Sequence, residues 1–541
     1  MEMTELMSRV RGRLSLCKAH AEVNRQVVHI ADQVAEHALM PAGSEAPVLF
    51  FNASTRLTGL SLNAAFSLLT SWSLRLHGTP IVNFVCTRGM SQCVLGTQRS
   101  ETSKNPPCAS CISQSNALFV GSERINFHFS ADPELEKALR GQDLDGLMAF
   151  QYEDFPLGQL VLPSARWILR RHHLQADPIT LRILRDYIRS AWSVKVAFEK
   201  ALESSPISAV VVFNGMQYPE ATVRLLARQK GLPVYSHEVG LRPFSAFFTE
   251  GDATAYPLSL PADFQLNKNQ LDQVNAYLSA RFKGNFHMAG VKFWPEISAL
   301  DADFLKQARA FKQVVPVFTN VIFDTSQPHA NVLFEDMFVW LDEILKTAKS
   351  HPETLFVIRA HPDETRQGKA SEESVSDWAQ RQGVAQLPNV RFIPPQEYVS
   401  SYDLIGMAKF VLVYNSTIGL EASILGAAVL SAGKSRYTAA DVVFMPADKA
   451  AYAKCLESLL TEDEIEVPKR FKTNGLRFLY WQLYRASLSF EDFLEADGIW
   501  PGYVKLRNFN PSALLPENSP TLKTITEGIR GKSDFILRED V

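Results

Sequence analysis

One segment near the middle of the chain gathers residues that could handle a phosphate. Residues 357–364 have the sequence Val-Ile-Arg-Ala-His-Pro-Asp-Glu. Arg359 can grip a phosphate with two parallel hydrogen bonds, and His361 can give a hydrogen bond or a proton to a departing phosphate. Pro362 ends the apolar strand and fixes the turn. The alternative is a surface loop in which Arg359 pairs with one of the two acidic residues that follow.

A second segment has the same plan, an apolar strand that passes into a helix. Residues 413–422 have the sequence Val-Tyr-Asn-Ser-Thr-Ile-Gly-Leu-Glu-Ala. Ser416 and Thr417 can cap the helix, whose first N–H groups and positive dipole end make an anion site. Gly419 allows close backbone approach, and Glu421 can accept hydrogen bonds from the two hydroxyls of a ribose. The alternative is an ordinary helix cap with a structural role only.

A candidate base closes an earlier predicted strand, at residues 234–240. A hydroxyl that acts as a nucleophile needs a nearby carboxylate or imidazole to take its proton. Glu238 is the first choice for this group and His237 the second. The alternative is a structural ion pair between Glu238 and Arg228 or Arg242.

Weaker candidates for acceptor binding come from a basic run and from a turn. Residues 166–173 have the sequence Arg-Trp-Ile-Leu-Arg-Arg-His-His. Arg170 and Arg171 could meet an anionic glycan or a lipid headgroup at the inner membrane surface, with a solvated helix face as the alternative. Asn214, which closes a predicted strand, is either a substrate-contacting turn or a plain turn.

Four cysteines form a spaced set, Cys-x6-Cys followed by Cys-x2-Cys, made of Cys86, Cys93, Cys108 and Cys111. Zinc takes four soft ligands in a tetrahedron, although the first spacing is wider than is usual for zinc. A structural zinc, unliganded thiols and a disulfide are the three alternatives. Six cysteines in 541 residues are too few for a disulfide scaffold.

The candidate residues lie in two series of alternating apolar and amphipathic stretches, which is typical of mostly parallel sheets covered by helices. In the first series, strands are predicted at residues 48–51, 81–85 and 209–213. In the second series, they are predicted at residues 314–319, 355–359, 390–393, 410–413 and 428–431. Ligands bind outside the carboxyl ends of such strands, so we expect the candidates of each series at one sheet edge.

Taken together, the strand-end motifs resemble one enzyme family. Arg-Ala-His-Pro at 359–362, combined with residues 415–422, resembles the sugar-nucleotide half of the capsular polysaccharide biosynthesis glycosyltransferases, and residues 317–321 fit the opening strand of that half. The best-understood members of the family transfer Kdo from CMP-Kdo. The resemblance covers residues 205–435 and implies an α/β chain of the GT-B type, with two facing Rossmann-like doubly wound domains.

The resemblance also implies roles for these residues. Glu238 and His361 are expected to be catalytic, with His361 neutralising the departing phosphate. The expected nucleotide-sugar-binding residues are Arg359, Pro362, Ser416, Thr417, Gly419, Glu421 and Asn320. UDP-sugar 2-epimerases share the fold and the ribose Glu, so a sugar-nucleotide epimerase is the second expectation. A non-catalytic component of polysaccharide assembly is the third.

We predict four parts in the chain. They are an N-terminal helical extension (1–44), a Rossmann-like acceptor domain (45–300) that carries the cysteine loop 86–111, a Rossmann-like nucleotide-sugar domain (301–470), and C-terminal helices with a tail (471–541).

The overall composition narrows the class of protein. A net charge of -3 gives no global basic footprint for nucleic acid, and no apolar run approaches the roughly 18 to 20 residues that span a bilayer. The expected location is the cytoplasm, with peripheral contact at the inner membrane. The expected partners are a nucleotide sugar donor and a glycan or glycolipid acceptor of the bacterial surface, and catalysis is expected to need no cofactor.

Overall fold

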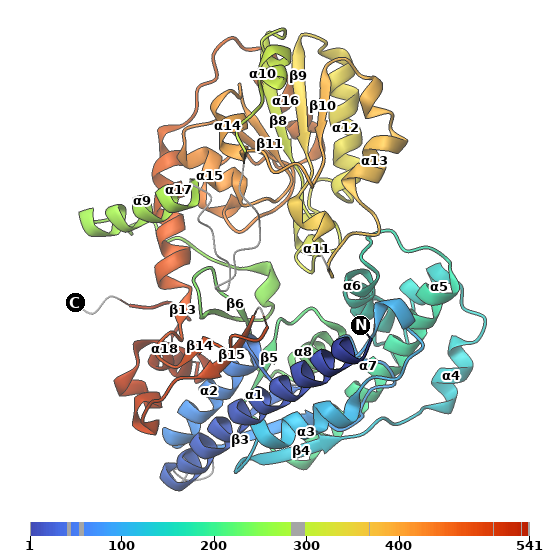
Figure 1. Cartoon of the computed structure of the whole chain (residues 1–541), viewed down its shortest axis with the longest axis vertical. Coiled ribbons are helices and arrows are strands. Elements are labelled where there is room, and N and C mark those ends of the chain that lie inside the picture. Colours follow the sequence, from blue (N-terminus) through green and yellow to red (C-terminus); the bar gives the residue numbers. More distant parts are fainter. Residues whose placement is uncertain are drawn as a thin grey trace.

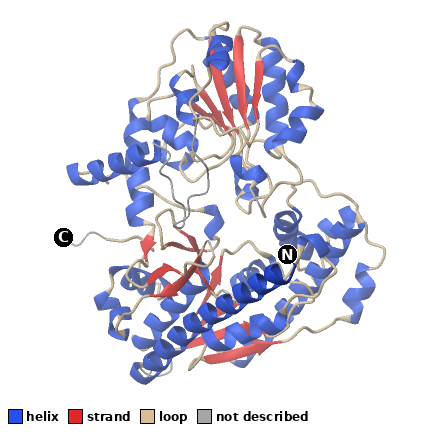
Figure 2. Ribbon diagram, in the orientation of Figure 1, coloured by secondary structure: helices blue, strands red, loops and turns tan. Residues whose placement is uncertain are grey.

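The protein, seen here as a computed structural model, consists of two α/β lobes that lie one above the other (Figure 1). The structure describes residues 2–39, 45–53, 59–282, 298–366, 368–500, 502–531 and 533–538. Each lobe is built on a central sheet with helices on both faces (Figure 2). The predicted end of the N-terminal extension, at residue 44, lies outside the described residues.

The first lobe contains a seven-stranded sheet of order β13-β7-β6-β5-β1-β3-β4. Its parallel strands are β1 (Val48–Asn52), β3 (Ile81–Cys86), β4 (Glu123–Phe127), β5 (Ala209–Phe213) and β6 (Val234–Val239). β7 (Ser245–Glu250) and β13 (Leu488–Ser489) extend the sheet in antiparallel fashion. The first strand lies in the centre and the chain changes direction between β1 and β5, which is the Rossmann order with its ligand-binding switch point.

The second lobe repeats this order in a five-stranded sheet, β10-β9-β8-β11-β12, in which all pairs are parallel. The strands are β8 (Gln313–Phe318), β9 (Thr354–Arg359), β10 (Val390–Ile393), β11 (Val411–Val413) and β12 (Val429–Ser431). The switch point lies between β8 and β11. The predicted fold class, two facing Rossmann-like doubly wound domains of the GT-B type, is confirmed.

Helices separate each sheet from solvent on both faces. In the first lobe they are α1 (Glu2–His37), α2 (Leu62–Leu76), α3 (Cys108–Leu118), α4 (Pro133–Leu139), α5 (Leu144–Met148), α6 (Leu157–Leu169), α7 (Pro178–Ser204), α8 (Tyr218–Gln229) and α18 (Pro520–Ile529). In and beside the second lobe they are α9 (Lys268–Phe282), α10 (Ala302–Ala308), α11 (Gln327–Ala330), α12 (Met337–Ser350), α13 (Val375–Arg381), α14 (Ser401–Gly406), α15 (Ile418–Ile424), α16 (Lys449–Thr461) and α17 (Lys469–Tyr480). The central strands β1, β5, β8 and β11 are buried along almost their whole length because both faces of each sheet are covered there, whereas the edge strand β4 is largely exposed.

The C-terminal segment crosses back from the second lobe to the first. α17 leads down towards the first lobe (Figure 1), where β13 pairs with β7. Residues 471–541, predicted as helices and a tail, also hold β14 (Leu494–Ala496) and β15 (Tyr503–Leu506), which form a small sheet with β2 (Leu60–Ser61). Strands this short leave too little alternation to be detected in a sequence. Among the described helices, none has the length and apolar character needed to cross a membrane.

Candidate active site

A cleft of about 500 Å³ separates the two lobes and faces the carboxyl ends of both sheets. The first lobe contributes the ends of β1, β5 and β6, which supply Asn52, Asn214 and Glu238. The second lobe contributes side chains from the loops that follow its strands. The volume lies within the range of small-molecule binding sites.

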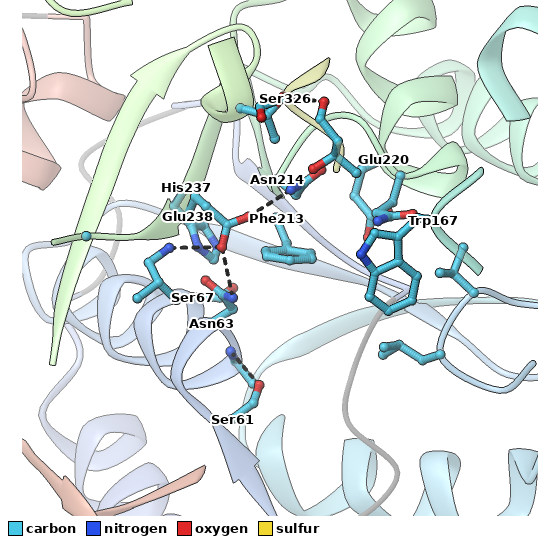
Figure 3. A pocket seen from close by; sticks show the side chains of 18 of the residues that line it. Ser61, Asn63, Ser67, Trp167, Phe213, Asn214, Glu220, His237, Glu238 and Ser326 are labelled. Carbon is cyan, nitrogen blue, oxygen red and sulfur yellow. Dashed lines mark hydrogen bonds between the residues drawn. The ribbon is translucent and has the colours of Figure 1, made fainter. Parts of the chain in front are cut away.

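Glu238 lies on the wall of this cleft, surrounded by amide groups (Figure 3). Asn214 Nδ2 donates to Glu238 Oε2 at 2.8 Å, while Asn63 Nδ2 and the backbone N–H of Val239 donate to Oε1 at 3.4 and 3.0 Å. Burial raises the pKa of the Glu238 carboxyl, although these hydrogen bonds oppose the shift. Within the described residues no Lys or Arg forms an ion pair with it, so the alternative pairing with Arg228 or Arg242 is wrong.

The Asn214 amide is aimed at Glu238 by an unusual turn. Asn214 has φ +60° and Gly215 has φ +90°, both in the left-handed region that few residues other than Gly and Asn enter. Asn214 Oδ1 accepts from the backbone N–H of Met216 at 3.0 Å, which leaves Nδ2 to face the carboxylate. The predicted turn therefore orients a cleft residue.

His237, the second choice for the base, belongs to the cleft lining, but its ring packs among aromatic side chains. Its side chain is buried, and its ring centroid lies 5.2 Å from that of Phe248 and 6.1 Å from that of Phe213. Burial lowers the pKa of His237 to about 3. A neutral imidazole in this setting supports the sheet and leaves Glu238 as the candidate base.

The second lobe presents three cations to the cleft, Arg366, Lys369 and Arg436. Arg436 follows β12, and its guanidinium lies 3.2 Å from the centroid of the Tyr256 ring of the first lobe. Sequence reasoning missed these residues. The only available signal was their place in loops that follow β9 and β12, strands of the same sheet edge.

Arg359 and His361, predicted for the donor phosphate, are held by their own lobe. Arg359 donates to the Val399 carbonyl at 3.0 Å, and burial lowers its pKa to about 10. His361 Nδ1 accepts from the backbone N–H of Asp363 at 3.2 Å and caps the short helical turn that begins at Pro362. Burial lowers the pKa of His361. In the described part of the chain, the cleft lining does not include the predicted residues Arg359, His361 and Pro362.

The segment before α15 differs from its prediction. α15 begins at Ile418, and the Thr417 side chain makes no capping hydrogen bond. The Ser416 carbonyl accepts from the Tyr437 hydroxyl at 2.6 Å. A Cβ on Gly419 would lie 2.3 Å from the same hydroxyl, so the glycine is needed for packing against Tyr437. The predicted side-chain cap is therefore absent, and the space that Gly419 leaves is filled by the protein itself.

Glu421, predicted for the ribose, is a buried carboxylate with strong partners. Arg281 Nε donates to its Oε1 at 2.5 Å, and the Tyr402 hydroxyl donates to its Oε2 at 2.6 Å. Both oxygens are thus engaged within the protein. Asn320 lies at the switch point of the second sheet, where its Oδ1 accepts from the backbone N–H of Asn415 at 3.3 Å.

The two arginines of the basic run lie in different surroundings. Arg171 pairs with Asp177 at 3.5 Å. Arg170 is buried at the boundary between the lobes, where its guanidinium lies 4.3 Å from the Trp167 ring and 5.0 Å from the Phe323 ring. Burial lowers the pKa of Arg170 to about 10. Only Trp167, among these residues, lines the described cleft.

Two groups of side chains contain residues that can act as metal ligands. His172, His173 and Asp336 offer ligand atoms that all lie within 4.8 Å of one another. Hydrogen bonds from His173 to Asp336 and Glu373 raise its pKa to about 10. This group therefore fits an ion-paired contact between the lobes. The second group is the four predicted cysteines, which line one small cavity beside the cleft, as described below.

Comparison with known proteins gives distant likenesses. No protein-family model matches the chain. Protein FixF of Sinorhizobium fredii (strain NBRC 101917 / NGR234) is 28% identical over 290 residues, which cover 52% of this chain and 61% of that protein. The chain thus spans about three fifths of the length of this curated relative.

Two solved structures with a similar architecture are the beta Kdo 2,4 transferase KpsC of Thermosulfurimonas dismutans and the UDP-GlcNAc 2-epimerase of Methanocaldococcus jannaschii. The first is 16% identical with a TM-score of 0.35, over 52% of this chain and 81% of that chain. The second is 12% identical with a TM-score of 0.26, over 54% and 80%. The fold assignment given above depends on the strand order of the two sheets alone.

Proposed function

We propose that the chain is a glycosyltransferase that moves a sugar from a nucleotide-activated donor to a hydroxyl of a surface polysaccharide or glycolipid. One observation carries this proposal. A single cleft has Glu238, a carboxylate without a cationic partner among the described residues, on one wall, and Arg366, Lys369 and Arg436 on the other. Sugar transfer from a nucleotide needs a base for the acceptor and positive charge for the departing phosphate.

The roles follow from the two walls. The phosphate of the donor would lie against the cations of the second lobe, which stabilise the negative charge that grows as the bond between sugar and phosphate breaks. The acceptor oxygen attacks the anomeric carbon, its proton passes to Glu238, and the nucleotide leaves with the bonding electrons. A raised pKa makes Glu238 a stronger base once it is ionised.

The acceptor would bind along the first lobe. Asn63 Oδ1 is a buried cleft atom without a hydrogen-bond partner in the described part of the chain, so it is available to an acceptor hydroxyl. The Trp167 ring lies on the same lining and offers an apolar face to a sugar (Figure 3). Arg359 and His361 lie outside the described cleft lining, so the proposed contact with the donor phosphate falls to Arg366, Lys369 and Arg436.

The test is a nucleotide panel followed by product analysis, both on the full chain. We expect one of CMP, UDP, GDP or dTDP to stabilise the protein, by about 2.7 kcal/mol at a hundred times its Kd. The matching nucleotide sugar should then release free nucleotide only when an acceptor is present. An epimerised donor formed without acceptor would indicate the isomerase instead, and no stabilisation by any nucleotide would indicate a non-catalytic component.

A further inference from the structure

Four cysteines from three separate segments meet at one cavity of about 30 Å³ next to the cleft. Cys86 is the last residue of β3, and Cys93 lies in the loop that follows it. Cys108 and Cys111 lie in the first turn of α3. All four are half-buried and line the same cavity.

The first two sulfurs sit in turns of the same kind. The backbone N–H of Gly89 donates to Cys86 Sγ at 3.3 Å, and that of Gly96 donates to Cys93 Sγ at 3.2 Å. In both turns the donor comes three residues after the cysteine. A Cβ on Gly96 would lie 2.8 Å from Cys93 Sγ, so only glycine lets this turn close around the sulfur. These hydrogen bonds fix the positions of the two sulfurs at the cavity.

The other two sulfurs are placed by a helix. Cys108 and Cys111 are three residues apart and so lie on one face of α3. They are in its first turn, so both sulfurs lie near the N-terminal end of this helix. Arg88 also lines the cavity and brings a positive charge to it.

We propose that Cys86, Cys93, Cys108 and Cys111 bind one structural Zn²⁺ as four thiolates. Such a site is tetrahedral, carries a net charge of about -2 and holds its sulfurs about 3.8 Å apart. Among the described residues, His172, His173 and Asp336 are the one set of three whose ligand atoms lie within 4.8 Å of one another. No three of the cysteine sulfurs therefore lie this close together. The metal would therefore draw the thiols together across the cavity, and Arg88 would offset the net charge.

The site would hold one wall of the cleft in place. The loop between β3 and α3 has a single three-residue helical turn, Arg99–Glu101, as its regular structure in the described chain. Leu95 lines both the cysteine cavity and the cleft. Arg99 forms an ion pair with Glu372 of the second lobe at 2.9 Å. A zinc at the base of this loop would thus fix side chains that the substrate and the other lobe contact.

The test is the zinc content of the full chain, purified under reducing conditions without chelator. We expect about one equivalent per chain in the wild type and less than about a fifth of that in the double variant Cys108→Ser/Cys111→Ser. The matched control is Cys455→Ser, a half-buried cysteine of α16 outside the cavity, which should keep its zinc. Less than about half an equivalent in the wild type, or equal zinc in the double variant, overturns the proposal.

A second measurement on the wild type covers the case in which the double variant fails to fold. Exchange of the metal for Cd²⁺ should produce the ultraviolet band of cadmium–thiolate charge transfer, and chelation should make four further thiols reactive towards an alkylating reagent. If the thiols react equally with and without chelator, or if alkylation without reductant shows a disulfide within the set, the proposal is wrong. Neither result touches the proposed sugar transfer, which is tested by nucleotide binding.

Discussion

Glu238 near the end of β6 and Glu421 in the first turn of α15 both lie close to the carboxyl ends of Rossmann-ordered sheets, yet their partners differ. Glu238 receives hydrogen bonds from the neutral amides of Asn214 and Asn63 and lines the cleft. Glu421 is buried against the guanidinium of Arg281 and the hydroxyl of Tyr402. Neutral donors orient a carboxylate and leave it able to take a proton, whereas a buried cation holds it as a fixed charge. This difference supports the proposed catalytic role of Glu238 and favours a structural role for Glu421.

The largest expected effect is a loss of stability when Glu421, the residue of this pair with a structural role, is replaced. Glu421→Ala leaves the Arg281 guanidinium in a buried place without its carboxylate, which typically costs about 3 to 5 kcal/mol. Urea unfolding should show this loss. Replacing both residues by Met in one variant should recover most of it, because a well-packed apolar pair is often as stable as a buried ion pair.

The same variant separates the two roles considered for Glu421. If it held a ribose, Glu421→Ala would weaken nucleotide binding and leave the free energy of unfolding near that of the wild type. That outcome would restore the role implied by the family resemblance and remove the contrast with Glu238.

The next effect is on turnover. Glu238→Gln keeps the shape of the side chain and an oxygen for the Asn214 amide but removes the base, so kcat should fall at least about a hundredfold. Nucleotide binding should stay unchanged, because the cations lie on the other wall. Glu250→Gln, at the exposed end of the neighbouring strand β7, is the control.

The dependence of activity on pH provides a second test of the role of Glu238. Glu238 acts in its ionised form, so activity should fall as the pH drops through its pKa, which burial places above the ordinary value of a glutamate. The residual activity of Glu238→Gln should lack this acidic limb. Near-normal turnover in Glu238→Gln, with the limb retained, would assign the proton to another group.

Glu238 and Glu421 also differ in how well their surroundings could be predicted from the sequence. The positions of most parallel strands and the end of β6 follow from apolar runs bounded by turns, and this is how Glu238 and Asn214 were identified. The partners of Glu421 could not be found in this way, since Arg281 is 140 positions away and no spacing rule links them. Glu421 matches the ribose pattern in the sequence, and only the folded chain shows that both of its carboxylate oxygens have partners within the protein.

The cations of the second wall were missed for a related reason. Arg366 and Arg436 lie in loops, and the direction of a loop depends on contacts made far along the chain. For Arg436 the deciding contact is the ring of Tyr256, which belongs to the other lobe. A strand-end motif predicts which sheet edge binds a ligand, whereas the side chains that reach the ligand depend on how the lobes face each other.

A smaller effect, on nucleotide binding, is expected when one of these cations is replaced. Arg436→Gln removes one charge from the proposed phosphate site and should weaken nucleotide binding about tenfold, within the range for a hydrogen bond to a charged group. Titration calorimetry with the nucleotide found in the panel measures this change. Lys434→Gln, two positions away and exposed, should bind like the wild type. Equal losses in the two variants would indicate a general effect of charge and move the phosphate away from Arg436.

The smallest effect concerns the contact that holds the two walls opposite each other. His173 donates to Asp336 and Glu373 of the second lobe at 3.1 and 2.7 Å, and these bonds raise its pKa to about 10. A raised pKa stabilises the fold fully below the ordinary value near 6.5, and this contribution is lost as the pH rises through about 10. The side chain is 56% exposed, so solvent screening limits the change to about 1 kcal/mol or less.

His173→Gln should therefore flatten the fall in unfolding free energy between these pH values, whereas His29→Gln, at an exposed position of α1, should leave it as in the wild type. The neighbouring His172 does not interfere, because burial lowers its pKa to about 4 and it stays neutral throughout the window. Added salt should reduce the wild-type slope, since an exposed ion pair is screened. A slope that persists in His173→Gln would mean that another group titrates. The His173 contact would then contribute nothing to the stability of the lobe arrangement in which Glu238 faces the cations.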